Sequence, residues 1–390
     1  MRKIITGNLN SYFSEISNRR SETMLCNYSV TMLIALLVAG CSAESKSEII
    51  SNISFAEKEQ QLLKILGDFP DPPPLEVDTL EAVELDNGWR YKIEYTAEEA
   101  DTIFDTPVDR IKAYLFVPDH EEGEKLPAMV AIHQDGPQMH LGKLEPAGLA
   151  GAKDQHYGLE LFNKGYVVIC PDRFPHAERR RITDPDTAGT DRYRDTFAAG
   201  HWLGQLILSD RTSTGKEVYD LMRATDVLYS LGCVDKERIG AIGHSAGGYN
   251  LVYFMFVDKR IIAGVSSCGF FELIDFYNEH VAMKRLGANA LPGLAKIGKS
   301  ADYLALLAPR PFMMTRGLWE WGKEGKWKQY SKEHVAETKE IEDYARQRYS
   351  ELEASENLKT IYFDEKGGDH AFPPKLKKEV FQWLDSYLMP

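Results

Sequence analysis

The sequence is poor in cysteine, has no surplus of basic residues and contains no apolar run long enough to span a bilayer. Cys170, Cys233 and Cys268 stand far apart, which excludes the close pairing of structural zinc sites and disulfide-rich modules, and we expect buried free thiols. The formal net charge of −13 excludes a basic nucleic-acid surface and opposes adsorption to anionic lipid. Internal repeats and low-complexity tracts are absent, so neither a solenoid nor wholesale disorder is expected.

The first forty residues differ from the rest. Arg19 and Arg20 precede the apolar run 30–39 (VTMLIALLVA), which is too short for a transmembrane helix but suits the core of a signal peptide. The run leads into VAGC, which resembles a bacterial lipobox and implies cleavage before Cys41 and lipidation of that cysteine. We therefore expect a lipoprotein signal peptide over 1–40 and a lipid-anchored protein of the cell envelope. The alternative is a small buried N-terminal helix.

Residues 41–79 are predicted to tether this anchor to the folded body. They begin polar and serine-rich and include the proline-rich segment 68–76 (DFPDPPPLE), so we expect one catalytic domain over 80–390. The absence of Asp at Ser42, after the cysteine, favours the outer membrane over the inner one. Because the leader is long, Met24 is a second candidate for the start of translation.

From residue 80 onward, strand-like runs alternate with runs of helical period, which is typical of a mainly parallel sheet with helices on both faces. Eight strands are predicted, at 90–95, 111–117, 128–133, 166–170, 239–243, 262–267, 311–315 and 360–364. Helices are expected at 215–232, 291–307, 333–353 and 375–388. The segment 174–215 is too long for a simple connection, and we expect an insertion that partly covers the site.

The strongest chemical signal is the segment 238–250 (RIGAIGHSAGGYN), in which Ser245 follows an apolar strand and precedes a helix-like run. A sharp strand-to-helix turn crowds its own backbone, so glycines are needed on both sides, as at Gly243 and Gly247. Such a turn exposes the serine oxygen above a helix start that stabilises negative charge. Ser245 is therefore the predicted nucleophile. The alternative is a purely structural glycine turn.

A serine hydroxyl requires a base, which in turn requires an orienting carboxylate, in the chain order nucleophile, acid, base. His370 is the predicted base, because it lies in a glycine-rich loop (EKGGDHAFP) between the last strand and the last helix. His280 and His334 lie in helix-like sequence and fit less well. The remaining possibility is that His370 is an exposed loop histidine.

The predicted acid is Glu320, which follows the strand 311–315. Asp364, at the end of the next strand, and Glu324 remain alternatives. Acyl transfer also needs donors for the oxyanion. We predict the backbone N–H groups of Ala246, directly after the nucleophile, and Gln134, in the loop after the strand 128–133, unless that loop is only a turn.

The segments PAMVAIHQDG, GKEVYDLMRATDVLYSLGCVDKERIGAIGHSAGG, LLAPRPFMMTRG and GGDHAFP together resemble the α/β-hydrolase superfamily, in its dienelactone-hydrolase-like and acetylxylan-esterase-like branch, over residues 85–390. The resemblance implies Ser245, Glu320 and His370 as the triad, and the amides of Gln134 and Ala246 as the oxyanion hole. It implies no metal or organic cofactor. Two departures stand out: dienelactone hydrolases have a cysteine nucleophile, and the acid is usually Asp.

These observations predict a serine esterase that works through an acyl-enzyme and removes short acyl groups, such as acetyl, from glycans or other extracytoplasmic molecules. Four tryptophans could stack on sugar rings or fill a core or lid: Trp202, Trp319, Trp321 and Trp327. Two alternatives stay open, a peptidase related to the prolyl oligopeptidases and a non-catalytic surface lipoprotein that binds a ligand. The sequence leaves the acyl length and the leaving group undetermined.

Overall fold

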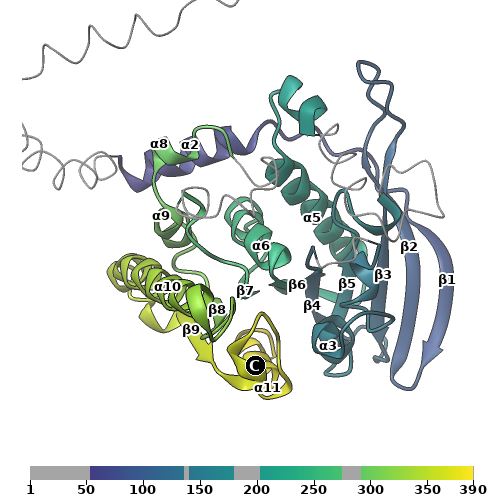
Figure 1. Cartoon of the computed structure of the whole chain (residues 1–390). Helices are drawn as coiled ribbons and strands as arrows, with labels where there is room; N and C mark the ends of the chain where they lie inside the picture. Colours follow the sequence, from purple (N-terminus) through teal and green to yellow (C-terminus); the bar gives the residue numbers. More distant parts are fainter. Residues whose placement is uncertain (1–52, 136–139, 180–202, 275–290, 390) are drawn as a thin grey trace, which may run out of the picture. The chain divides into compact units, whose positions relative to one another are not determined.

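The computed structural model describes residues 53–135, 140–179, 203–274 and 291–389 (Figure 1). The predicted signal peptide, Cys41, Met24, Trp202 and His280 lie outside these residues, as does 180–202 of the expected insertion. No helix in the described ranges is long and apolar enough to cross a membrane.

A nine-stranded sheet in the order β1-β2-β3-β5-β4-β6-β7-β8-β9 forms the centre of the domain. The pairs from β1 to β5 are antiparallel, and all pairs from β5 to β9 are parallel. The strands are β1 (Asp78–Leu85), β2 (Gly88–Glu98), β3 (Asp109–Pro118), β4 (Leu126–Ile132), β5 (Val167–Pro171), β6 (Val234–His244), β7 (Ala263–Ser267), β8 (Phe312–Gly317) and β9 (Leu358–Phe363).

The eight predicted strands are all present, and β1 is a ninth that the sequence pattern did not predict. This strand is almost wholly exposed, because it lies at the edge of the sheet and pairs only with β2. None of the β1 side chains is buried, and its sequence (DTLEAVEL) lacks the strict apolar alternation by which strands are predicted.

The helices are α2 (Phe55–Leu66), α3 (Tyr157–Phe162), α5 (Ser213–Ser230), α6 (Ala246–Val257), α8 (Leu294–Ile297), α9 (Ser300–Ala305), α10 (Gly325–Glu351) and α11 (Pro374–Leu388). The helix expected over 291–307 is two short helices, because the chain turns at Gly298 and the Asp302 carboxylate accepts the N–H of Lys299 at 2.8 Å. Helix α10 starts eight residues earlier than predicted.

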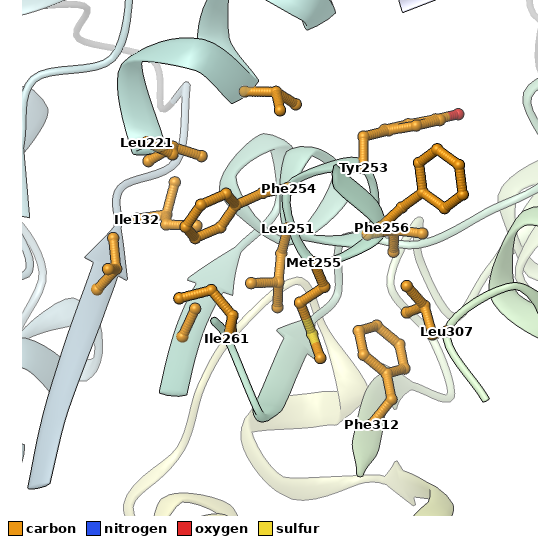
Figure 2. Packing of buried hydrophobic residues seen from close by; sticks show 14 of the residues in the cluster. Ile132, Leu221, Leu251, Tyr253, Phe254, Met255, Phe256, Ile261, Leu307 and Phe312 are labelled. Carbon is orange, nitrogen blue, oxygen red and sulfur yellow. The ribbon is translucent and has the colours of Figure 1, made fainter. Parts of the chain in front are cut away.

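Two apolar cores lie on the two faces of the sheet, because successive side chains of a strand point to opposite sides. In β4, Ala128 and Val130 belong to the core with α5 and α6, whereas Met129 and Ala131 belong to the core with α3 and α11. Figure 2 shows the first core, where side chains of α6 meet Ile132 at the end of β4. Truncating one such buried leucine to alanine costs about 2–5 kcal/mol.

The folded domain begins at Ser54, so the prediction of a tether reaching residue 79 is wrong. Helix α2 starts with a capping box between Ser54 and Glu57 and buries Leu62 and Leu66 in the core. The hydroxyl of Thr212 donates to the Leu66 carbonyl at 2.7 Å. The sequence SFAEKEQQLLKIL, residues 54–66, carries this capping signal, which the polar composition around it concealed.

Candidate active site

Ser245 occupies the turn between β6 and α6 with a strained backbone, φ 54° and ψ −124°. Glycine is required on both sides of Ser245, because a side chain at either position would clash with neighbouring backbone atoms. A Cβ on Gly243 would lie 2.4 Å from the carbonyl of Gly247, and one on Gly247 would lie 2.4 Å from the Ile132 oxygen. Strain of this kind is kept where function requires it. The strained turn leaves Ser245 partly exposed at the N-terminus of α6, where the helix dipole favours negative charge.

His370 and Glu320 are joined by a short hydrogen bond, 2.6 Å from Nδ1 to Oε1. Glu320 follows β8 and His370 follows β9, and the Trp319 N–H donates to the Gly368 carbonyl at 2.8 Å, which ties the two loops together. The His370 side chain is 28% exposed, whereas Glu320 is 1% exposed. Because β6, β8 and β9 run parallel, their carboxyl ends bring Ser245, Glu320 and His370 to one edge of the sheet.

Arg316 holds Glu320 in its ionised form. Its Nη1 donates to Oε2 of Glu320 at 2.6 Å, and its Nη2 donates to the carbonyl of Phe270. Burial raises the pKa of Glu320, but the Arg316 charge and the His370 hydrogen bond outweigh it, so the pKa lies well below its ordinary value. The site residues predicted from the sequence did not include Arg316. An arginine within the apolar run FMMTRG is nevertheless a signal for a buried charge partner.

The predicted oxyanion donors come from two segments that touch. Gly247 packs against the carbonyls of Ile132 and His133, so the first turn of α6 lies against the end of β4. Ala246 is the first residue of α6, and Gln134 directly follows His133. The segments that carry the two amides therefore lie against each other beside Ser245, and the oxyanion roles of the amides stay a prediction.

Comparisons with known proteins agree with this architecture. Residues 208–319 match the model of the prolyl oligopeptidase family. The Bacillus subtilis (strain 168) protein YtaP, whose assigned name is that of a hydrolase, is 27% identical over 276 residues, which are 67% of this chain and 80% of YtaP.

Among solved structures, a Bacteroides fragilis protein assigned as an acetyl xylan esterase superposes with a TM-score of 0.63 at 17% identity, over 92% of this chain and 95% of the other. A glucuronoyl esterase from Solibacter usitatus gives a TM-score of 0.54 at 13% identity, over 84% and 91%. The chain has the α/β-hydrolase fold. The fold predicted from the sequence is thus confirmed, and the likeness to these solved structures is one of fold.

The fold does not bring the other candidate residues to His370. Asp364 is 59% exposed and pairs with Lys323 at 3.2 Å. Glu324 is exposed at the start of α10. His334 lies on α10 and contacts Glu337 of the same helix at 3.2 Å. Of the three carboxylates considered, only Glu320 contacts the imidazole.

Arg173 clamps the loop that carries Gln134. Its N–H donates to Nε2 of His133 at 2.9 Å, so the proton of this ring is on Nδ1, which donates to the Gln134 carbonyl at 2.7 Å. Its guanidinium donates to the His133 carbonyl at 3.0 Å and to Glu217 at 2.6 Å. Burial and the neighbouring charges of His176 and Arg173 lower the pKa of His133, which keeps it neutral. The clamp joins residues about forty positions apart, so sequence spacing gave no sign of it.

A histidine, His244, and a free thiol, that of Cys268, lie next to the Glu320–His370 pair. The His244 ring lies 4.7 Å from the His370 ring, and its Nδ1 contacts the Ser267 hydroxyl at 2.9 Å. Burial, and then the charge of His370, lower the pKa of His244. Cys170 and Cys268 are free and buried, as expected, whereas Cys233 is free but only half-buried. Burial raises the pKa of the Cys268 thiol, so it stays protonated.

Two side-chain sets of the described chain offer three potential metal ligands each: Cys268, Glu320 and His370 in the site, and Glu98, Asp109 and Asp220 elsewhere. In the first set, Glu320 is already bound by Arg316 and His370. In the second, the Lys216 ammonium contacts all three carboxylates at 2.6–2.7 Å, so a lysine stands where a cation would bind.

Proposed function

We propose that this hydrolase is a serine esterase in which Ser245 is the nucleophile, His370 the base and Glu320 the orienting acid. The observation that carries the proposal is the buried, ionised Glu320 bonded to His370 at the sheet edge where the strained Ser245 turn is exposed. Because Nδ1 of His370 is committed to Glu320, Nε2 is the nitrogen that takes the serine proton.

The reaction then proceeds in two balanced halves. The Ser245 oxygen attacks the ester carbonyl as its proton passes to His370, and the resulting oxyanion is stabilised by the amides of Ala246 and Gln134. The alcohol leaves with the proton from His370. Water next attacks the acyl-enzyme, gives its proton to His370, and the acid departs as Ser245 is reprotonated. Arg316 keeps Glu320 ionised throughout, so the imidazolium is stabilised rather than neutralised.

The proposed substrates are short acyl esters, acetyl first, on glycans or other extracytoplasmic molecules. Two proteins of the same fold support this: one is assigned as an acetyl xylan esterase and another is a glucuronoyl esterase, so the fold is compatible with esters on carbohydrates. No step requires a metal or an organic cofactor.

Initial rates on p-nitrophenyl acetate and butyrate test the nucleophile, with the soluble body of residues 42–390. Ser245→Ala is expected to lower turnover by about 10⁴- to 10⁶-fold. Ser386→Ala, an exposed serine of α11, is the matched control and should be unaffected. Equal rates for Ser245→Ala and wild type would exclude Ser245 as nucleophile, and two inert proteins would favour a binding lipoprotein.

A peptidase is the second candidate, because residues 208–319 match the prolyl oligopeptidase family. Glycyl-prolyl p-nitroanilide tests it beside p-nitrophenyl acetate. We expect cleavage of the ester and none of the anilide. Faster turnover of the anilide would replace the esterase proposal.

We further propose a lipid anchor at Cys41 in the bacterial cell envelope, at the outer membrane. The VAGC sequence after an apolar run supports it. Labelling cells with radioactive palmitate should mark the wild type and Cys26→Ala but not Cys41→Ala. Label on Cys41→Ala would refute the anchor, and recovery of the wild type in the inner-membrane fraction would refute its placement.

A further inference from the structure

A continuous line of aromatic rings leads from His370 to the surface of the domain. Trp321 stacks on the His370 ring at 6.2 Å, and the Tyr330 ring lies 5.8 Å from Trp321. Trp327, on the first turn of α10, follows at 6.5 Å from Tyr330. Trp327 is 44% exposed, so the line ends in an indole open to solvent.

Lysines flank this line although the chain is acidic overall. The Lys326 ammonium lies 5.0 Å from the Trp327 ring, and the Lys328 ammonium lies 5.9 Å from the Trp319 ring. Both lysines are exposed, and among the described residues neither pairs with a carboxylate. The patch is therefore locally positive in a protein whose formal net charge is −13.

Packing alone accounts for only part of this arrangement. Trp321 and Tyr330 are half-buried and help to hold α10 against the loop after β8, as any aromatic pair would. Trp327 gains little from packing, because nearly half of its surface meets water. The exposed Trp327 indole lies beside the Lys326 ammonium, and the Lys328 ammonium lies beside the neighbouring Trp319 ring. An apolar ring and positive charge in one region are the chemistry that binds a sugar ring bearing a carboxylate.

We propose that this surface, formed by Trp321, Tyr330, Trp327, Lys326 and Lys328, binds a glycan that carries free carboxylates, so that an ester on the same chain reaches Ser245. The exposed Trp327 indole stacks on a sugar ring, and the two ammonium groups attract uronate carboxylates. This inference rests on the proposed function, and it narrows the substrate to acyl esters of an acidic glycan, a polymer that contains uronic acid units.

Binding, not turnover, tests the surface. In the Ser245→Ala background, the dissociation constants of tetragalacturonate and xylotetraose are measured by isothermal titration calorimetry at 20 mM and 500 mM NaCl. At low salt we expect tetragalacturonate to bind at least about tenfold more tightly than xylotetraose. The difference between the two affinities should shrink at high salt, because salt screens exposed charges.

Two variants separate the contribution of the indole to glycan affinity from that of the lysine charges. Trp327→Ala should weaken both oligosaccharides, tetragalacturonate about tenfold. Lys326→Gln/Lys328→Gln should weaken only tetragalacturonate, about threefold to tenfold, and reduce its salt dependence. The matched control is Lys125→Gln/Lys236→Gln, which removes the same charge from exposed lysines that lie before β4 and at the start of β6, the opposite edge of the sheet.

The possible results of these titrations either support or overturn the proposed surface. Equal affinity for the acidic and neutral oligosaccharides overturns the charge assignment, and no binding of either overturns the surface. Equal losses in the control variant, or equal binding of tripolyphosphate, reduce the effect to general attraction of polyanions and also overturn it. The far-ultraviolet circular-dichroism spectrum of Trp327→Ala should match that of the wild type, which establishes that the variant folds. Because these affinities are independent of hydrolysis, their failure leaves the esterase proposal intact.

Discussion

Two buried clusters of opposite charges in this protein differ in whether every charged group in them is paired. Around Lys216, the carboxylates of Glu98, Asp109 and Asp220 all contact the same ammonium, and arginines complete the set. At the candidate active site, Arg316 binds one oxygen of Glu320 and the other oxygen bonds to His370, which reaches solvent. A fully matched cluster can only hold the fold together, whereas a cluster that ends in an imidazole can exchange a proton.

Glu320→Gln should have the largest effect, because the amide cannot stabilise an imidazolium and can hold the wrong tautomer of His370. We expect turnover of p-nitrophenyl acetate to fall about 10³- to 10⁴-fold, with the Michaelis constant little changed. Steady-state kinetics measure both. Asp364→Asn is the matched control and should retain full turnover, and a loss there equal to that of Glu320→Gln would move the acid to Asp364.

Lys216→Met should act on stability and leave the chemistry alone. Removing the ammonium leaves three carboxylates with too little positive charge around them, and loss of one partner of a buried ion pair costs about 3–5 kcal/mol. Urea unfolding followed by circular dichroism measures this loss. A variant as stable as the wild type would contradict the stabilising role of the Lys216 cluster. A folded variant with reduced turnover would contradict the view that this cluster takes no part in the chemistry.

Arg316→Gln should have a smaller effect on turnover, about 10²-fold. The glutamine can still donate to Glu320 but removes the charge that lowers the pKa of that carboxyl. Without it, burial raises that pKa, so turnover should fall at acidic pH where wild type still works. A pH–rate profile measures the shift, and an unchanged profile would show that Arg316 is only structural.

The pH dependence of stability gives the smallest expected effect. Burial raises the pKa of Glu98, but Lys216 and Arg211 outweigh it and lower the pKa from an ordinary value of 4.5 to about 2. A lowered carboxyl pKa stabilises the fold above pH 4.5, and this stabilisation is lost as the pH falls from 4.5 towards 2. Glu98→Gln should therefore unfold with a shallower pH dependence in that range. If the unfolding free energies of both proteins depended on pH with the same slope, Glu98 would not contribute to the stability that the cluster provides.

The parts that sequence predicts are those with local patterns. The parallel strands are apolar runs because both faces are buried, and the Ser245 turn is flanked by glycines that its own backbone contacts require. Glu320 was favoured because it follows β8, and the structure places it against His370; its catalytic role stays a prediction. Arg173 and Lys216 could not be predicted, because their partners lie on other elements far along the chain.

The backbone of Ser245 also has a consequence for how such a chain is selected. At φ 54° and ψ −124° a residue with a side chain is strained by about 1–3 kcal/mol, and glycine would be relaxed there. A sequence optimised for stability alone would therefore carry glycine at this position and lose the hydroxyl that we propose as the nucleophile. The fold retains a serine at a strained backbone position, so a Ser245→Gly variant should unfold at a higher temperature than the wild type.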